Sequence, residues 1–291
     1  MPRETAIARD GKMSVIVAMD TATDVISVDA KRARLGEILR ANSPLIIAYS
    51  GGVDSAFLLA EARRELGDRV LGVIADSPSL PRASLAEAVA LARAIGAPVE
   101  VVKTQELDNP DYAANPPNRC YFCKAELFQT LDALARSRGY PAIAYGENAD
   151  DMRQDRPGRR ASEEFQIIAP LRDAGLTKAE IRQLSRDIGL PTADAPAQPC
   201  LSSRIPWGTP VTTDALAMVE RAEEHIRSLG FRVFRVRHVV KQDAPPSALV
   251  QIAPGELLLA APVQSEIERG IRAAGYASVE IDPGGYRGPS L

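Results

Sequence analysis

Apolar runs and helical periods alternate along the first two thirds of the chain. Between Asp29 and Ala41 apolar residues recur at helical spacing, and Pro44 follows that helix. Short apolar runs then predict buried strands at residues 45–50, 70–74, 99–102, 142–145 and 167–171. Helical patterns lie between or after them at residues 54–66, 84–95, 124–138 and 177–188. Because short connections between such units favour parallel strands with right-handed crossovers, we predict an α/β fold with a doubly wound, mostly parallel five-stranded sheet.

The pattern changes after residue 190. Residues 191–212 contain five prolines and no period, which is typical of a linker, and this linker carries Cys200. Helical patterns at 213–229 and 255–274 (interrupted near Pro262) alternate with strand patterns at 231–240, 248–252 and 277–281. We therefore predict a smaller C-terminal α+β domain over residues 213–291, after a larger domain over 29–190. Residues 1–28 stay unassigned.

Composition narrows the classes of function. A chain of 291 residues can form one large and one small domain. A net charge of −3 argues against an extended nucleic-acid surface, so no nucleic-acid partner is expected. Three cysteines without a signal peptide or a long apolar run predict a cytoplasmic protein with reduced thiols and no membrane partner.

The segment Ser50-Gly51-Gly52-Val53-Asp54-Ser55 joins the first predicted strand to a helix. A glycine pair before a helix N-terminus lets backbone N–H groups surround an anion, so the segment predicts a phosphate site. It lacks the lysine and the four-residue gap of the common ATPase loop. Asp76 and the cluster Gly146-Glu147-Asn148-Ala149-Asp150 follow other strands, and ligands bind at that edge of such sheets. Asp76 also fits an ordinary turn residue.

The 50–55 segment resembles the SGGxDS loop of the ATP pyrophosphatases, enzymes that cleave ATP between the α and β phosphates. The resemblance implies that residues 29–190 form a PP-loop ATP-binding domain that uses Mg²⁺. The residues it implies for ATP and pyrophosphate are Ser50, Gly51, Gly52, Val53, Asp54, Ser55, Gly146, Asn148 and Asp150, with Asp76 as a further candidate. The stretch Asp155-Arg156-Pro157-Gly158 resembles a D-x-R-P-G-like element that closes over the active site in this family, whereas most of the other arginines of 151–165 are expected to lie in a solvated loop.

The three cysteines suggest a second chemistry. Cys120 and Cys123 have metal-ligand spacing near a helix start, so they fit either a redox pair or half of a metal site. Cys200 adds a third thiol. The two histidines, His225 and His238, both lie in the second domain, so a four-ligand zinc site is not favoured. Three thiolates suit a [4Fe-4S] cluster with one open iron, and ordinary buried thiols are the alternative.

Several later motifs resemble the ATP-dependent sulfur transferases of nickel-pincer nucleotide cofactor synthesis, the LarE family. These motifs are residues 199–209, 229–231, 235–237 and 282–287. The resemblance implies adenylation of the carboxylates of pyridinium-3,5-biscarboxylic acid mononucleotide and their conversion to thiocarboxylates. Sulfide carried on a [4Fe-4S] cluster of Cys120, Cys123 and Cys200 would supply the sulfur, with Asp54 and Ser203 as further catalytic residues. A sulfide donor and a homohexamer are also implied.

An anionic substrate requires cationic donors. Arg204, Arg235 and Arg237 fit this requirement, because a guanidinium binds carboxylate or phosphate through two N–H groups. Arg235 and Arg237 lie two apart on a predicted strand and therefore on one face, with Val236 toward the core; an exposed basic stripe is the alternative. The resemblance adds Ser203 and Glu223 to the substrate site, and Trp207 is expected to be a packing residue.

Two other functions remain open at this point. A tRNA-thiolating enzyme can also combine the SGGxDS loop with three cysteines and a cluster, although the acidic balance disfavours it. A non-catalytic ATP-binding protein with structural zinc would explain the same residues without turnover.

Overall fold

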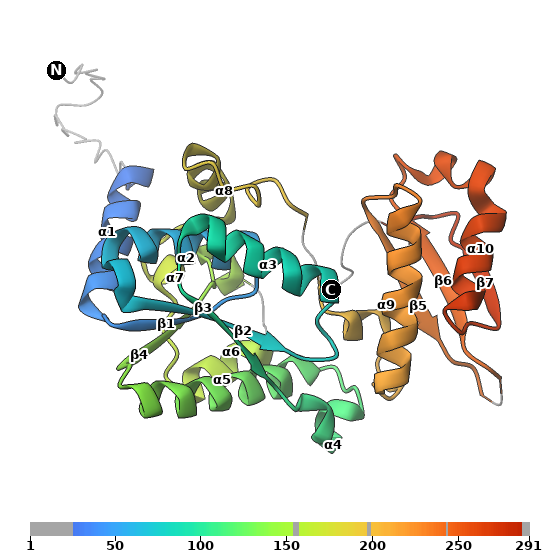
Figure 1. The fold of residues 1–291 in the computed structure, drawn as a ribbon, viewed down its shortest axis with the longest axis horizontal. Helices are drawn as coiled ribbons and strands as arrows, with labels where there is room; N and C mark the ends of the chain where they lie inside the picture. The colour runs from blue at the N-terminus through green and yellow to red at the C-terminus, as the bar shows by residue number, and fades with distance from the viewer. Residues whose placement is uncertain (1–25, 154–156, 197–198, 243, 287–291) are drawn as a thin grey trace, which may run out of the picture.

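The computed structural model describes residues 26–153, 157–196, 199–242 and 244–286. It contains two sheets, each with its own helices (Figure 1). The strands are β1 (Leu45–Ala48), β2 (Val70–Asp76), β3 (Val99–Lys103), β4 (Ala142–Tyr145), β5 (Phe234–Val239), β6 (Ser247–Ile252) and β7 (Ser278–Ile281). The α-helices are α1 (Val28–Ala41), α2 (Val53–Leu66), α3 (Arg82–Ile95), α4 (Pro110–Ala113), α5 (Arg119–Arg138), α6 (Pro157–Glu164), α7 (Pro170–Asp173), α8 (Lys178–Asp187), α9 (Thr213–Ser228) and α10 (Gln264–Ala273).

The larger sheet has the order β3-β2-β1-β4, and its strands are all parallel. Helices cover both faces. One buried cluster joins the sheet to α1, α2, α3 and α8, and another joins it to α5 and α6. The doubly wound α/β prediction is therefore confirmed.

The predicted fifth strand, 167–171, is reduced to a single parallel bridge between Ala144 and Ile168. Pro170 begins the short helix α7 immediately afterwards. Because proline has no N–H group to donate to a ladder, the strand cannot continue through it.

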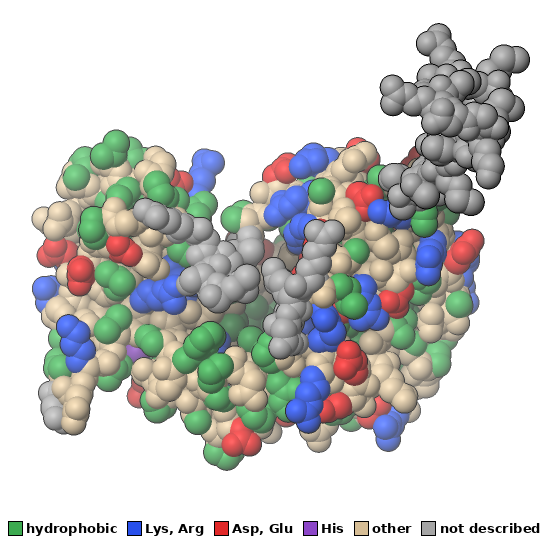
Figure 2. All heavy atoms as spheres, turned by 180° about the vertical axis from the view of Figure 1, so that it is seen from behind, with side chains coloured by type: hydrophobic (Ala, Val, Ile, Leu, Met, Phe, Trp, Pro, Cys, Tyr) green, Lys and Arg blue, Asp and Glu red, His purple; other side chains and the backbone are tan. Residues whose placement is uncertain are grey.

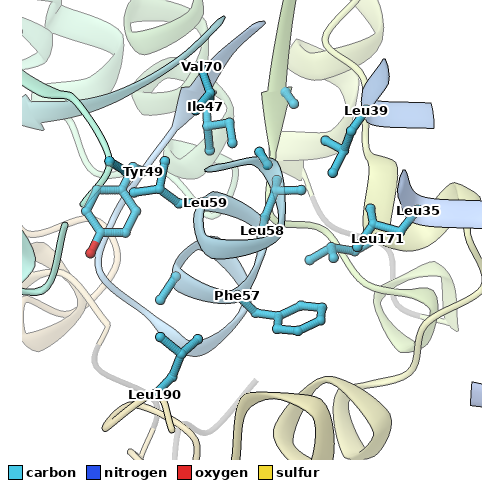
Figure 3. Close-up of a cluster of buried hydrophobic side chains, with 14 of the residues drawn as sticks. Leu35, Leu39, Ile47, Tyr49, Phe57, Leu58, Leu59, Val70, Leu171 and Leu190 are labelled. Atoms are coloured by element: carbon cyan, nitrogen blue, oxygen red, sulfur yellow. The ribbon is translucent and has the colours of Figure 1, made fainter. Parts of the chain in front are cut away.

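Helix α2 lies at the centre of the larger core. Phe57, Leu58 and Leu59 are fully buried and point to different neighbours around the helix (Figure 3). Leu58 and Leu59 lie toward the sheet and Phe57 toward the helices on its far side. Burying each such side chain contributes about 1.5–3 kcal/mol, so the N-terminus of α2 is held firmly at the sheet edge.

The smaller sheet has the order β5-β6-β7, with β5 antiparallel and β7 parallel to β6. Helices α9 and α10 cover one face through a separate buried cluster. The interruption predicted near Pro262 appears as two short 3₁₀ turns before α10. The C-terminal α+β architecture agrees with the sequence, while the boundaries at residues 190 and 212 stay a prediction.

Three local predictions were wrong. Helix α5 begins at Arg119 rather than near residue 124, so both nearby cysteines lie inside its first turns. Part of the expected loop 151–165 is helix α6, which begins with Pro157 in the position where a helix tolerates proline best. Trp207 is 65% exposed and is not a packing residue.

The loops after β1, β2, β3 and β4 all lie at the carboxyl edge of the parallel sheet, where ligands bind in folds of this kind. Seen from behind, the surface is hollowed between the two lobes, with Lys and Arg side chains on both sides of the hollow (Figure 2). Within the described ranges, no helix has both the length and the apolar character required to cross a bilayer.

Candidate functional site

The loop between β1 and α2 is shaped for an anion. Gly51 has a φ of 75°, and a Cβ placed on it would lie 2.6 Å from Cβ of Ala88. Gly52 is the N-cap of α2 and provides no side chain to cover the first N–H groups of the helix. Those N–H groups and the positive helix end can therefore receive a phosphate group.

Two hydroxyl groups close this loop. The Ser50 N–H donates to Oγ of Ser55 at 3.2 Å, and the two serine Oγ atoms lie 3.1 Å apart. The Ser55 hydroxyl lies 3.2 Å from the Gly52 carbonyl oxygen and donates to it. Ser50, Gly51, Gly52 and Ser55 thus form one compact turn, with Asp54 beside it and Val53 buried as the first residue of α2.

The loop after β4 packs directly against this turn. A Cβ on Gly146 would lie 2.8 Å from the Ser55 nitrogen, so only glycine permits the close approach. Asn148 donates from Nδ2 to Oδ2 of Asp54 at 3.3 Å and accepts the Asp150 N–H through Oδ1 at 2.9 Å. The structure therefore brings together the two predicted halves of the nucleotide site.

Lys178 is a site residue that the sequence reasoning missed. Its Nζ donates to both carboxylate oxygens of Asp54, at 2.8 and 2.9 Å, and its backbone N–H donates to Asp150 at 2.8 Å. Lys178 is the first residue of α8 and lies inside the capping box formed by Thr177 and Glu180. The sequence of this segment predicted only the start of a helix, and it contained no sign of a contact with Asp54.

Asp76 lies at the same edge but is engaged elsewhere. Its carboxylate pairs with Arg82, which also donates to the carbonyl oxygens of Ser77 and Leu80 at 2.6 Å each. These contacts fix the turn after β2. They favour the turn role of Asp76, while its nucleotide role stays a prediction.

Glu147 anchors the loop after β4 from below. It is 5% exposed, and its carboxylate accepts hydrogen bonds from Arg159 at 3.2 Å and Arg172 at 2.8 Å. Burial alone would raise the pKa of Glu147, but hydrogen bonds from Tyr145 and Arg159 and the charges of both arginines outweigh it and lower the pKa. Arg159 had been expected to lie in a solvated loop, so this part of the prediction was wrong.

The three thiols come from two distant segments. Cys120 is exposed and Cys123 half-buried in the first turns of α5, and Cys200 is exposed just before the 3₁₀ turn η4 (Leu201–Arg204). Burial raises the pKa of Cys123, and the nearby charges of Cys200, Glu106 and Cys120 raise it further. Cys123 packs against the buried cluster that contains Leu201, the residue after Cys200, and none of these three described cysteines forms a disulfide.

The donor chemistry fits an iron–sulfur group. Thiol sulfurs are ligands that suit iron, and bound iron would stabilise the thiolate form of Cys123 that burial disfavours in the metal-free chain. In the part of the chain that the structure describes, however, no three His, Cys, Asp or Glu side chains are already arranged as metal ligands. The side chains of a cluster site would thus have to move together when a group binds. Glu106, 2% exposed, adds a carboxylate to the same region, and its Oε1 has no hydrogen-bond partner among the described residues.

Arg204 and Glu223 are bound to each other. Nε and Nη2 of Arg204 donate to the two carboxylate oxygens at 2.8 Å each, and both side chains are less than 10% exposed. Arg204 also donates to the carbonyl oxygen of Cys200 at 3.1 Å and to Oγ of Ser203 at 3.1 Å. The pair joins the cysteine-bearing segment to α9, and a direct substrate contact by Arg204, Glu223 or Ser203 stays a prediction.

Arg235 differs from Arg204 because no carboxylate forms an ion pair with it in the described ranges. It is 3% exposed, donates to Oη of Tyr286 at 3.1 Å and lies over that ring at 4.9 Å. Burial lowers the pKa of Arg235, and the nearby positive charges of Arg204 and Arg237 act in the same direction. The alternative of an exposed basic stripe is therefore wrong for Arg235, whereas Val236 points into the core as predicted.

Arg237 shares the outer face of β5 with Arg235. Its Nε donates to Oε1 of Gln251 on β6 at 3.1 Å, and Gln251 in turn donates to Asp282 at 2.8 Å. This half-buried arginine is thus oriented by the neighbouring strand and lies close to the buried cation of Arg235.

An open cavity of about 600 Å³ lies beside the start of α5. Its lining includes Asn118, Tyr121 and Phe122 from α5 and its cap, and Pro157, Arg159 and Arg160 from α6. Pro157 and Gly158 belong to the D-x-R-P-G element, while residues 155 and 156 lie outside the described ranges. The cavity is large enough for a small organic molecule next to the Cys120 turn.

Comparison with known proteins identifies the family of the chain. No protein-family model matches the chain. A pyridinium-3,5-bisthiocarboxylic acid mononucleotide synthase from Lactiplantibacillus plantarum is 31% identical over 258 residues, covering 88% of this chain and 92% of the relative. An uncharacterized Synechocystis protein is 41% identical over 263 residues, covering 89% and 94% of the two chains.

A more distant likeness is confined to part of the chain. A glutamine-hydrolyzing GMP synthase from Thermomicrobium roseum is 29% identical over 209 residues, covering 63% of this chain and 39% of that enzyme. The match to the Lactiplantibacillus enzyme extends over most of both chains. It shows that the chain belongs to the LarE family of pyridinium-3,5-bisthiocarboxylic acid mononucleotide synthases.

Proposed function

We propose that the chain is an ATP-dependent sulfur insertase acting on pyridinium-3,5-biscarboxylic acid mononucleotide, for synthesis of a nickel-pincer cofactor. The family relationship supports sulfur insertion, and the GMP synthase likeness supports ATP use. One observation carries the proposal further. The phosphate loop follows β1, and the neighbouring loop after β2 holds the Cys200 segment, because the Leu201 N–H donates to the Ser79 carbonyl oxygen at 2.8 Å.

The first step is activation of a carboxylate. A substrate carboxylate oxygen would attack the α-phosphorus of ATP, and pyrophosphate would leave into the loop formed by Ser50 to Ser55 and the N-terminus of α2. Asp54 would hold Mg²⁺, and Lys178 beside it would balance charge on the leaving pyrophosphate. AMP bound to the carbonyl is then a leaving group.

The second step is the transfer of sulfur. A [4Fe-4S] cluster held by Cys120, Cys123 and Cys200 would supply a sulfide nucleophile in the same pocket. Attack at the activated carbonyl carbon forms the C–S bond and releases AMP with one of the original carboxylate oxygens. The chain itself contributes orientation, because the segment with Cys200 is fixed to both lobes.

The arginines would select the substrate. Buried Arg235, with Arg237 beside it, can neutralise the phosphate of an anionic mononucleotide. Arg204 and Glu223 would orient the segment that faces the substrate, with Ser203 next to it. A separate sulfide donor and a homo-oligomeric state complete the proposal, with no nucleic acid as partner.

The test is anaerobic incubation of iron- and sulfide-reconstituted protein with MgATP and the pyridinium biscarboxylate. We expect pyrophosphate, AMP and a substrate mass gain that corresponds to sulfur replacing oxygen. With ¹⁸O in the substrate carboxylate, the label should appear in AMP. A substrate that stays unchanged while the protein contains its cluster would refute the assignment.

A further inference from the structure

Three buried hydroxyl groups form a closed ring between the two lobes. Oγ of Ser79, Oη of Tyr112 and Oγ of Ser202 lie 2.7 Å from one another in all three pairs. Their residues are 3%, 1% and 0% exposed. Each hydroxyl can donate to one neighbour and accept from the other, so all three are satisfied within the ring.

The ring joins three separate segments. Ser79 lies in the loop after β2, Tyr112 lies in α4, and Ser202 lies in the turn η4 directly after Cys200 and Leu201. The Leu201 N–H donates to the Ser79 carbonyl oxygen at 2.8 Å, and Arg119 donates to the Ser202 carbonyl oxygen at 3.0 Å. The segment that follows Cys200 is therefore held from both sides.

Asn115 extends this attachment along the linker. It is fully buried, and its Nδ2 donates to the carbonyl oxygens of Pro206 and Thr209 at 2.8 Å each. The same five-residue stretch, Asn115 to Arg119, leads directly into the turn that carries Cys120. The two thiol-bearing segments thus share their anchoring residues.

Apolar side chains surround the hydroxyl ring, so three hydroxyl groups at this place need an explanation other than packing. Leu201, Ile205, Val211 and Leu216 pack with Tyr112 in a buried cluster, and Cys123 packs against that cluster. An apolar cluster would gain packing without hydroxyl groups, whereas hydrogen bonds in a ring of this kind require one specific arrangement. The ring therefore fixes its three segments in one specific arrangement and does more than hold them together.

We propose that the Ser79–Tyr112–Ser202 hydroxyl ring is a positioning device that holds Cys200 within reach of Cys120 and Cys123. Tyr112 lies between the two thiol segments, because it packs with Leu201 and Cys123 in the same buried cluster. The three ring members are positioning residues and do not contact the substrate. This inference depends on the proposed function in one respect, because it assumes that the three thiols act together.

Tyr112→Phe tests the ring, because it removes one hydroxyl and keeps the aromatic packing. In metal-free, reduced protein with Cys120→Ser, dibromobimane can link only Cys123 to Cys200, and the link is read by fluorescence and peptide mass. We expect the linking rate to fall about tenfold, since one buried hydrogen bond is removed and its partners lose their arrangement. Equal rates in Tyr112→Phe and its parent would overturn the proposal.

Tyr276→Phe is the matched control. Tyr276 is 2% exposed and its hydroxyl also has a buried partner, Nδ1 of His238 at 3.2 Å, but it lies in the core of the smaller sheet. The linking rate should not change in this variant, and an equal loss in both variants would show general loosening and refute a specific role. Should Tyr112→Phe fail to fold, Ser79→Ala removes another ring member and is measured in the same way.

Iron content separates this inference from the proposed function. After anaerobic reconstitution of the three-cysteine protein, we expect Tyr112→Phe to hold less iron and to show a weaker broad absorption than its parent. If the parent binds no iron, the cluster proposal fails, while the linking rates still decide the role of the ring. Normal linking in Tyr112→Phe refutes the ring whatever the iron content.

Discussion

The two halves of the site are built by different means. The nucleotide half depends on backbone shape: Gly51 and Gly146 allow segments to approach at distances that any Cβ would prevent, and the first turn of α2 presents its N–H groups. The thiol half depends on side chains, namely the ring of three hydroxyls and the Asn115 contacts. We infer that the nucleotide half is already arranged for its ligand, whereas the thiol side chains become arranged only when they bind their group.

The largest expected effect separates the two halves. Cys200→Ala should lower thiocarboxylate formation by at least about 10³-fold, because it removes one of the three proposed ligands of the sulfur-carrying group. Formation of pyrophosphate from ATP and the substrate should persist, since the phosphate loop is unchanged. Parallel assays of pyrophosphate and thiolated product check this, and loss of both together would contradict the separation.

Lys178→Met tests the nucleotide half. We expect kcat/KM for pyrophosphate formation to fall about 100-fold, since a cation next to the developing charge is removed. Lys31→Met is the matched control, because Lys31 pairs with Glu180 on the same helix at 2.7 Å but does not contact Asp54. Comparable losses in both variants would mean that Lys178 acts only through the stability of α8.

The two buried arginines give opposite expectations. Arg204→Met should lower the free energy of unfolding by about 3 kcal/mol, because it leaves the Glu223 carboxylate buried without its partner. Arg235→Met should change stability little, since no described carboxylate loses a partner, but it should raise the KM for the mononucleotide about tenfold. Urea unfolding and steady-state kinetics measure the two effects. A destabilisation of Arg235→Met as large as that of Arg204→Met would contradict the distinction.

The difference between the halves also explains what the sequence could predict. The loop 50–55 was recognisable because its function depends on residues that are adjacent in the chain and on a strand-to-helix order. Lys178 was not, because its partner Asp54 lies 124 positions away and only the packed fold brings them together. Helix α6 was missed for a local reason, since the polar and basic segment 151–165 has no hydrophobic period, although Pro157 fits the first turn of a helix.

The thiols show the same limit. Their spacing indicated a shared chemistry, but the ring that holds Cys200 joins residues 79, 112 and 202, none of which has a pattern of its own. Burial of Arg235 was equally invisible, because alternation along β5 indicates its face and not the covering by Tyr286. The strand prediction at 167–171 failed where Pro170 outweighed an apolar run.

The smallest expected effect concerns the support beneath the nucleotide half. The folded-state pKa of Glu147 lies below the ordinary value of 4.5. The charged Glu147 side chain therefore stabilises the fold fully above pH 4.5, and this stabilisation is lost as the pH falls through the folded-state pKa. Glu147→Gln should therefore lower the free energy of unfolding by about 1 kcal/mol at neutral pH, and the difference from the parent should shrink below pH 4.5. Thermal unfolding across this range measures it, with Glu37→Gln on the exposed side of α1 as a control that should show no change. If the difference in unfolding free energy between Glu147→Gln and the parent instead grew as the pH fell, the two arginines would not be the groups that stabilise this carboxylate. The loop after β4 would then be held in position only by its backbone contact at Gly146.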